Sequence, residues 1–163
     1  MKKFELTREF ITFLGRKLFR IKALVEFGDV KAGELGGYVE KEENINHEGN
    51  AWVYGNAWVY GNARVYGNAR VYGDARVYGD AQVEKQEDII FTAAKFGTIF
   101  RTTTAYRTID GIQINCGCFS GNLEEFREQI IRTREGRMRK KYLYHADEIE
   151  MYFDLDLEKR EEK

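Results

Sequence analysis

A six-residue repeat runs from Gly49 to Val83 and constrains the fold more than any other feature of the chain. Most units contain an Ala, one variable residue, a Val and a Tyr, followed by a Gly and then an Asn or Asp. The Ala and Val point to the same face of an extended strand, and the Gly-Asn or Gly-Asp pair turns the chain. One unit cannot bury its own Ala/Val face, so the units must stack and share one interior.

Two geometries can stack such units. The Tyr-Gly-Asn-Ala segments are compatible with hairpin turns, which would give an up-and-down meander. However, small Ala and larger Val recur at the same inward positions in every unit. A coil needs the same narrow and wide positions at every corner, whereas a meander reverses the chain at each turn. We therefore predict a coil.

The unit resembles the hexapeptide repeat of left-handed parallel β-helix proteins. That resemblance implies three units per turn, left-handed winding and a homotrimer. Residues eighteen apart would then stack at roughly the 4.8 Å strand spacing. The expected outward ladders place Trp52 over Arg70, Trp58 over Arg76, Tyr54 over Tyr72, and Tyr60 over Tyr78.

The whole chain is predicted to be mainly β, with four segments. An N-terminal cap spans 1–36, the left-handed parallel β-helix 37–84, a C-terminal ββ(β)αα module 85–158, and a solvated tail 159–163. Thr7 followed by Glu9 suggests a short helix within the cap. Counting back by six from Ala51 reaches Ile45 and Val39, so irregular units are expected to begin near Gly37.

The C-terminal module is expected to contain strands followed by helices. Runs rich in Ile, Phe and Thr predict three strands over 88–96, 97–108 and 111–119, with a two-residue turn at Asp110-Gly111. Asn122 and Glu125 form a capping-box pattern that begins a helix. Gly136 separates that helix from a second one. The expected buried faces are Leu123, Phe126, Ile130 and Ile131, and then Met138, Tyr142, Ala146, Ile149 and Phe153.

Two phrases carry a further resemblance. LGGYVEKEENINHEGNAWVYGNA and NCGCFSGNLEEF are similar to segments of phage and prophage repeat proteins that are labelled polymer-forming or transferase-like. This resemblance implies a phage or prophage origin.

Composition limits the partners and the compartment. The formal net charge is −1 with 33% charged residues, so no global field attracts nucleic acid or membrane. The chain has no apolar run long enough to span a membrane and no signal core. Two cysteines without a disulfide framework fit a reducing compartment. We expect a cytoplasmic protein, in the host cytoplasm if a phage encodes it.

Catalysis and metal binding receive little support. Many left-handed β-helix proteins are acyltransferases with a histidine base, and His47 is the one weak candidate here; an end-cap role is favoured for it. Related β-helix carbonic anhydrases hold zinc with three histidines, but this chain has two. Cys116 and Cys118 are interpreted as small core residues. No catalytic residue, metal or cofactor is therefore assigned.

The predicted ligand-binding set combines flat aromatic rings with guanidinium groups, which suit stacking on nucleobases and holding phosphates. The alternative, which is favoured because Tyr, Trp and Arg are common interface anchors, is that these faces pack against sister chains in a trimer. The set comprises Trp52, Trp58, Tyr60, Arg64, Arg70, Arg76 and Tyr78.

A basic cluster near the C-terminus is the second candidate surface. It could bind an acidic partner or phosphates, or it could pair with the acidic residues that follow it, such as Asp147 and Glu150. The predicted partner-binding residues are Arg134, Arg137, Arg139, Lys140 and Lys141.

The function expected from these observations is non-enzymatic binding. The protein would recognise a host macromolecule or sequester a small anionic ligand such as a signalling nucleotide, which would make it a counter-defence factor. Nucleic acid is a less favoured partner, and no membrane is expected. The alternatives are an acyltransferase-like enzyme and a structural, self-assembling coil.

Overall fold

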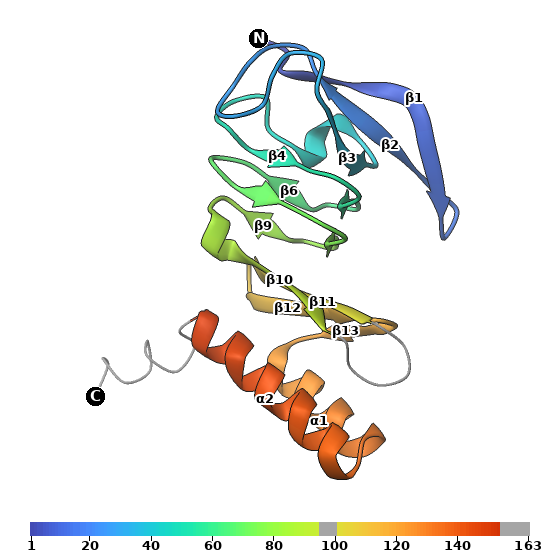
Figure 1. Ribbon diagram of the computed structural model, residues 1–163, viewed down its shortest axis with the longest axis vertical. Coiled ribbons are helices and arrows are strands. Elements are labelled where there is room, and N and C mark those ends of the chain that lie inside the picture. The colour runs from blue at the N-terminus through green and yellow to red at the C-terminus, as the bar shows by residue number, and fades with distance from the viewer. Residues whose placement is uncertain (95–100, 154–163) are drawn as a thin grey trace, which may run out of the picture.

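The computed structural model describes residues 1–94 and 101–153, which form an elongated molecule. Figure 1 shows, in order along its long axis, an N-terminal hairpin and loops, the stacked repeats, an antiparallel sheet and two helices. The N-terminus lies at one end of this stack and the helices lie at the other.

The repeats form a coil of two-residue strands that run parallel to their neighbours. Units three apart pair in register, joining Trp52 to Arg70, Trp58 to Arg76, and Arg64 to Gln82. Three units therefore complete one turn, and the parallel pairing rules out the meander. The strands are β4 (Trp52–Val53), β5 (Trp58–Val59), β6 (Arg64–Val65), β7 (Arg70–Val71), β8 (Arg76–Val77) and β9 (Gln82–Val83).

The interior of the coil contains the Ala and Val of every unit, as the alternation predicts. The six repeat valines have no exposed surface and the six alanines at most 1%. Each fully buried Val contributes roughly 1.5–3 kcal/mol relative to an exposed one, before the entropy cost of ordering the chain. At the corner, Gly49 has φ +71°, and a Cβ there would lie 2.5 Å from the Gly67 carbonyl oxygen.

The coil begins before the regular repeat, but in a different register from the predicted one. Val39 of β3 (Leu35–Val39) pairs with Val59, and Ile45 pairs with Val65, a separation of 20 residues rather than 18. Val39 and Ile45 thus fill Val positions, not the Ala positions that counting by six gives. The corner between Ile45 and Val53 absorbs the two additional residues.

An antiparallel hairpin of β1 (Phe4–Phe13) and β2 (Arg16–Ala23) precedes the coil and pairs with β3 through β2. The helix predicted from Thr7 is wrong. The Thr7 hydroxyl instead accepts a hydrogen bond from the Glu9 N–H at an irregularity in β1. Phe4 at the base of the hairpin belongs to the same buried cluster as the coil interior, so it covers the first turn.

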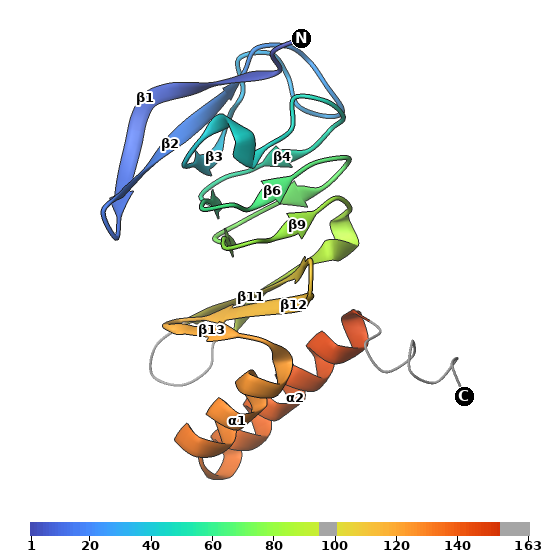
Figure 2. The ribbon, with the colours of Figure 1, turned by 180° about the vertical axis from the view of Figure 1, so that it is seen from behind.

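The far half of the hairpin leaves the end of the coil and descends along its side. Figures 1 and 2 show the β1–β2 turn on the same side of the coil as the outer end of the sheet below. The short 3-10 helix η1 (Glu42–Asn44) follows β3, and the Asn44 side chain donates to the carbonyls of Gly61 and Ala63.

Four antiparallel strands and two helices follow the coil. After the 3-10 helix η2 (Gln86–Asp88) come β10 (Ile89–Ala94), β11 (Arg101–Thr108), β12 (Gly111–Cys116) and a short unpredicted β13 (Phe119–Gly121). The β11–β12 turn is centred on Ile109 and Asp110, one residue before the predicted position, because Thr108 pairs with Gly111. Residues 95–100 and the predicted tail 159–163 lie outside the described residues.

The helices α1 (Leu123–Thr133) and α2 (Gly136–Tyr152) pack on one face of this sheet. The predicted capping box is present: the Asn122 side chain accepts from the Glu125 N–H, and the Glu125 carboxylate accepts from the Asn122 N–H, both at 2.9 Å. Most of the predicted helical face is buried, but Ile131 is 53% exposed, so its assignment to that face is wrong.

The other face of the sheet closes the lower end of the coil. Ala81 bridges to Thr108, and the ring of Tyr106 is fully buried in the coil cluster. The Tyr106 hydroxyl donates to the Tyr78 carbonyl at 3.0 Å and accepts from the Asn115 amide at 2.8 Å. Alternation along β11 and β12 thus separates an apolar helix side from a polar coil side.

Candidate functional site

The seven predicted ligand-binding residues lie on three different faces of the coil. The first face carries Trp52 over Arg70, the second Trp58 over Arg76, and the third Arg64 over Gln82. Because units three apart share a face, consecutive units lie on different faces of the coil. The sequence predicted the ladders correctly, but a single site containing all seven residues does not form.

The first face is covered by the chain itself. Trp52, predicted to point outward, has no exposed surface and packs edge-on against Phe4 and Phe27, with centroids 6.0 and 5.3 Å away. The prediction that Trp52 binds ligand is therefore wrong: the loop between β2 and β3 covers its ring. The Arg70 guanidinium pairs with Asp29 of that loop at 2.9 Å.

The tyrosines of the first face are also engaged. Tyr54 stacks on Tyr72 at 4.7 Å, and its hydroxyl donates to Asp29 at 3.0 Å. Burial and this contact with Asp29 raise the pKa of Tyr54 well above its usual range. The cation of this ladder, Arg70, is therefore already paired.

The second face brings four predicted residues together. Arg76 lies over the Trp58 ring at 4.3 Å, and Tyr60 stacks on Tyr78 at 4.8 Å with an interplanar angle of 16°. Phe13 from the hairpin joins them, 5.1 Å from Trp58 and 5.3 Å from the Arg76 guanidinium carbon. We call Phe13, Trp58, Tyr60, Arg76 and Tyr78 the second-face cluster.

Burial within this cluster changes the titration of Tyr60. Its side chain is only 8% exposed, and burial, followed by the neighbouring Tyr78, raises the pKa of Tyr60 to about 12. The Tyr60 hydroxyl that borders the cleft is therefore neutral at ordinary pH.

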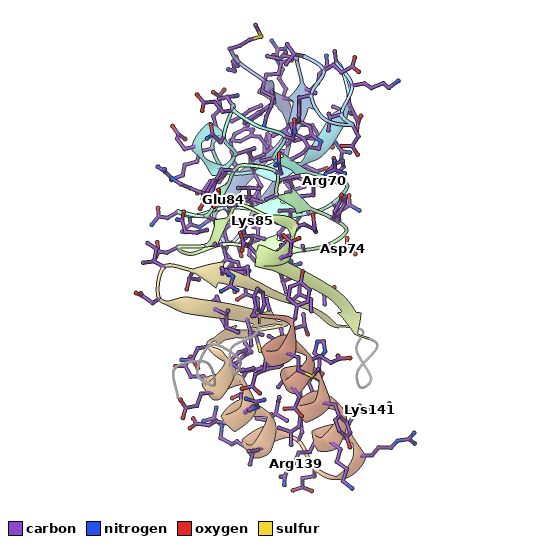
Figure 3. The ribbon with its side chains drawn as sticks, turned by 90° about the vertical axis from the view of Figure 1, so that its left-hand side faces the viewer. Arg70, Asp74, Glu84, Lys85, Arg139 and Lys141 are labelled. Carbon is purple, nitrogen blue, oxygen red and sulfur yellow. The ribbon has the colours of Figure 1, made fainter. Side chains whose placement is uncertain are left out.

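A cleft of about 820 Å³ opens beside the cluster, between the hairpin turn, the second face and the sheet. The hairpin contributes Phe13, Leu14 and Arg16, and the coil contributes Arg76 with the corner residue Asp74. Figure 3 labels Asp74 at the level where the lowest turns of the coil meet the sheet. The sheet side includes Thr102, Thr104, Asn115 and the exposed Cys118.

The two arginines of the cleft differ in their partners. Arg16 makes two hydrogen bonds to Glu40, at 2.8 and 2.9 Å. Burial of Glu40 favours its neutral form, but hydrogen bonds from the Gly61 N–H and from Arg16 outweigh that effect and hold its pKa below the usual value. Arg76 is exposed, and no carboxylate among residues 1–94 and 101–153 forms an ion pair with it.

Two hydrogen bonds to strands β11 and β12 hold the backbone of Arg76. Its N–H donates to the Thr104 hydroxyl at 3.4 Å, and its carbonyl accepts from the Asn115 amide at 3.4 Å. The position of this arginine thus depends on the sheet, which the sequence predicted as part of a separate C-terminal module.

The third face holds Arg64 and a separate pocket of about 500 Å³ that includes His47 and Glu42. His47 stacks on Phe4 at 4.5 Å, and its Nδ1 accepts from the Lys3 N–H at 3.1 Å. With that lone pair occupied, a neutral His47 carries its proton on Nε2, which lies 3.7 Å from Glu42. This geometry places His47 in the end cap and does not suit a general base.

Lys3 is a buried residue that sequence reasoning missed. Its ammonium donates to the carbonyls of Gly49 and Ala51 and lies 4.6 Å from the centre of the Phe27 ring. Burial lowers the pKa of Lys3 to about 8. The sequence around Lys3 carries no pattern that distinguishes it from a solvated lysine such as Lys2.

The predicted partner-binding cluster divides into structural and exposed members. Arg139 donates to the carbonyls of Ile131 and Arg134, closing the α1–α2 turn, and Arg134 lies over the Tyr142 ring. Arg137, Lys140 and Lys141 remain exposed. Figure 3 shows Arg139 and Lys141 on the helices, far from Arg70 on the coil.

The acidic residues predicted to pair with this cluster have another partner. Asp147 and Glu150 both bind Arg127, at 2.7 and 2.8 Å. The hydrogen bond that Arg127 donates to Glu150 is the largest of the effects that raise the pKa of Arg127, and partial burial opposes it. Charge pairing therefore joins α1 to α2 without the basic cluster.

The cysteines only half follow the prediction. Cys116 is buried and accepts from the Thr103 hydroxyl at 3.3 Å, whereas Cys118 is exposed beyond the turn at Gly117, so it is not a core residue. Within the described part of the chain, no three His, Cys, Asp or Glu side chains are grouped as a metal site would require.

The hairpin residues Phe13 and Arg16 were also missed as site residues. The sequence signal at this place was Gly15, a residue typical of turns. In the structure, Leu14 and Gly15 both have positive φ and turn the hairpin.

No described helix is long and apolar enough to cross a membrane.

Comparison with known families finds a similarity within the repeat. A family model described as the YdcK beta solenoid repeat matches residues 57–70 and 69–84. The matched stretch covers the regular part of the coil and well under half of the chain, so it supports a β-solenoid repeat protein of mainly β structure. A comparison with curated proteins finds no match.

Proposed function

We propose that this chain is a non-enzymatic binding protein that holds a small anionic ligand in the cleft beside the second face. The observation that carries the proposal is Arg76. Its guanidinium is exposed in the cleft, it is held by Trp58 and Phe13, and, unlike Arg16, it forms no ion pair with a described carboxylate. Arg70, the equivalent residue on the first face, has its charge matched by Asp29.

A sequestering role follows from this arrangement. A cleft of about 820 Å³ is large enough for a ligand the size of a signalling nucleotide. Taken with the resemblance to phage and prophage repeat proteins, the proposal is a phage-encoded counter-defence factor that acts in the host cytoplasm. The finer fold proposed with it is a left-handed parallel β-helix of the hexapeptide type, assembled as a homotrimer.

The competing interpretation, in which the second face packs against a sister chain, is less well supported. Phe13 and Arg16 of the hairpin already contact this face, through Trp58 and Glu40. A sister chain would have to displace the hairpin turn before it could reach the Trp58–Arg76 ladder. The trimer of this proposal therefore uses other surfaces.

Native mass spectrometry of protein purified gently from cells tests the proposal. We expect a trimer that carries a stoichiometric small anion, which is released on denaturation. Arg76→Gln should lose that mass while keeping its circular dichroism spectrum. Arg64→Gln, which makes the same change on the third face, is the matched control and should retain it. An empty wild-type trimer would contradict the proposal and direct attention to a macromolecular partner.

A further inference from the structure

The aromatic surfaces of the second-face cluster are used by the protein itself. One neighbour of Trp58 is Arg76 at 4.3 Å and another is Phe13 at 5.1 Å. Tyr60 and Tyr78 stack on each other at 4.8 Å. A ligand ring would have to compete with Arg76 and Phe13 in order to stack on Trp58, so stacking on this ring is a poor basis for recognition.

The hydrogen-bond donors of Arg76 are the complementary feature. The guanidinium carbon lies 4.3 Å from the centre of the Trp58 ring and 5.3 Å from that of Phe13, and a guanidinium carries five N–H donors in one plane. The backbone bonds to Thr104 and Asn115 restrain the residue further. Such a fork matches two oxygens of one carboxylate or phosphate.

The charges around the cleft point in the same direction. The Arg16 charge is balanced by Glu40, so Arg16 adds little net attraction. Asp74 is the carboxylate that lines the cleft, and no described contact joins it to Arg76. An anion on Arg76 must therefore be held by direct contact with the guanidinium rather than by a diffuse positive field.

We propose that Arg76 is the seat of a terminal oxyanion, a carboxylate or a phosphate monoester, and that the ligand is recognised by this group and not by stacking of a base. This inference rests on the proposed function and narrows its ligand class. The remainder of the ligand extends across the cleft towards Thr102 and Cys118 on the sheet. A nucleotide then binds by its phosphate.

Four probes test this inference on the full-length protein at low salt: ribose 5-phosphate, AMP, adenosine and succinate. The readout is protection of the exposed Cys118 from maleimide, with the buried Cys116 as the internal reference. Ribose 5-phosphate and AMP should protect Cys118 with similar midpoints, and adenosine should not. Protection by succinate would assign the oxyanion to a carboxylate source instead of a phosphate.

Two variants separate charge from geometry. Arg76→Gln should weaken protection by on the order of tenfold to a hundredfold, and Arg76→Lys should recover only part of that loss because a lysine has no planar fork. Arg64→Gln should leave protection unchanged. Each variant is compared by its thermal unfolding midpoint to establish that it folds.

The failures of the two proposals are distinguishable. Equal protection by adenosine and AMP, unchanged in Arg76→Gln, would overturn the oxyanion seat but keep a ligand in the cleft. No protection by any of the four probes would also overturn the seat. A small molecule retained in native mass spectrometry would then still support the proposed function, and an empty trimer would contradict both.

Discussion

The first and second faces of the coil carry the same ladder, a Trp stacked over an Arg, yet they have different environments. On the first face, the loop between β2 and β3 buries Trp52, and Asp29 pairs with Arg70. On the second face, the hairpin turn and the sheet border the ladder without closing it, and Arg76 is exposed. The repeat therefore supplies equivalent positions, and the non-repetitive segments decide which of them face a cleft.

Replacing each Trp with Ala gives the largest expected contrast. Trp52→Ala should cost about 3–5 kcal/mol because it empties a fully buried site. Trp58→Ala should cost roughly 1–2 kcal/mol, since its ring is partly exposed and loses mainly the Arg76 and Phe13 contacts. Chemical denaturation measures both changes. Equal costs for the two would show that the faces do not differ in burial as described.

The anchoring of the sheet beneath the second face is the next test. Tyr106→Phe removes the hydroxyl that donates to the Tyr78 carbonyl and accepts from Asn115. We expect a loss of about 1–3 kcal/mol, because two buried groups lose a partner. The same denaturation experiment applies, and faster maleimide labelling of the buried Cys116 should accompany the loss. Unchanged stability would mean that the sheet is held mainly by the apolar part of the Tyr106 ring.

A pH dependence is expected at the cap above the first face. Because burial lowers the pKa of Lys3 to about 8, the unfolded chain holds a proton between about pH 8 and 10.5 that the folded protein has released. The free energy of unfolding should therefore rise with pH from about 8, and Lys3→Met should remove this rise. Thermal unfolding from pH 7.5 to 9.5 measures it, below the range in which unfolded tyrosines ionise. Parallel wild-type and variant curves would contradict the assignment.

Opening the first face should have the smallest effect on stability. Asp29→Asn removes the partner of Arg70, and because the Asp29 side chain is 57% exposed, the ion pair contributes only about 0–1 kcal/mol. The informative result is binding: ribose 5-phosphate should still bind only at the second face, since Arg70 lies outside the cleft. A second equivalent of ligand, counted by native mass spectrometry, would show that the Asp29 pair alone distinguishes the two faces.

The parts of the structure that follow the period could be predicted from the sequence. Spacing together with the family resemblance gave the stacking of Trp58 over Arg76 and of Tyr60 over Tyr78, because a regular period fixes which residues share a face. The burial of Trp52 could not be predicted in this way. It depends on Phe27, which lies in a non-repetitive loop far from Trp52 in sequence and contacts it only in the folded chain.

Local signals misled where tertiary pairing decided the outcome. The pattern around Thr7 is compatible with a helix, but pairing with β2 makes β1 a strand. Counting back by six from Ala51 assigned Ile45 to an Ala position. That assignment is wrong because the corner near His47 contains two additional residues. The cleft itself brings together residues far apart in sequence, such as Arg16 and Thr102, so no short sequence pattern predicts it.

The pairing of units three apart also makes the coil a spacer of adjustable height. Inserting three further units between Val59 and Val77 would add one turn. It would move the sheet away from the hairpin by about 4.8 Å and leave Arg76 on the same side of the coil as Trp58, one turn further along. Inserting one unit would instead rotate the sheet to an adjacent face and separate it from Phe13. The distance between the hairpin turn and the sheet is thus set in discrete steps by the number of turns.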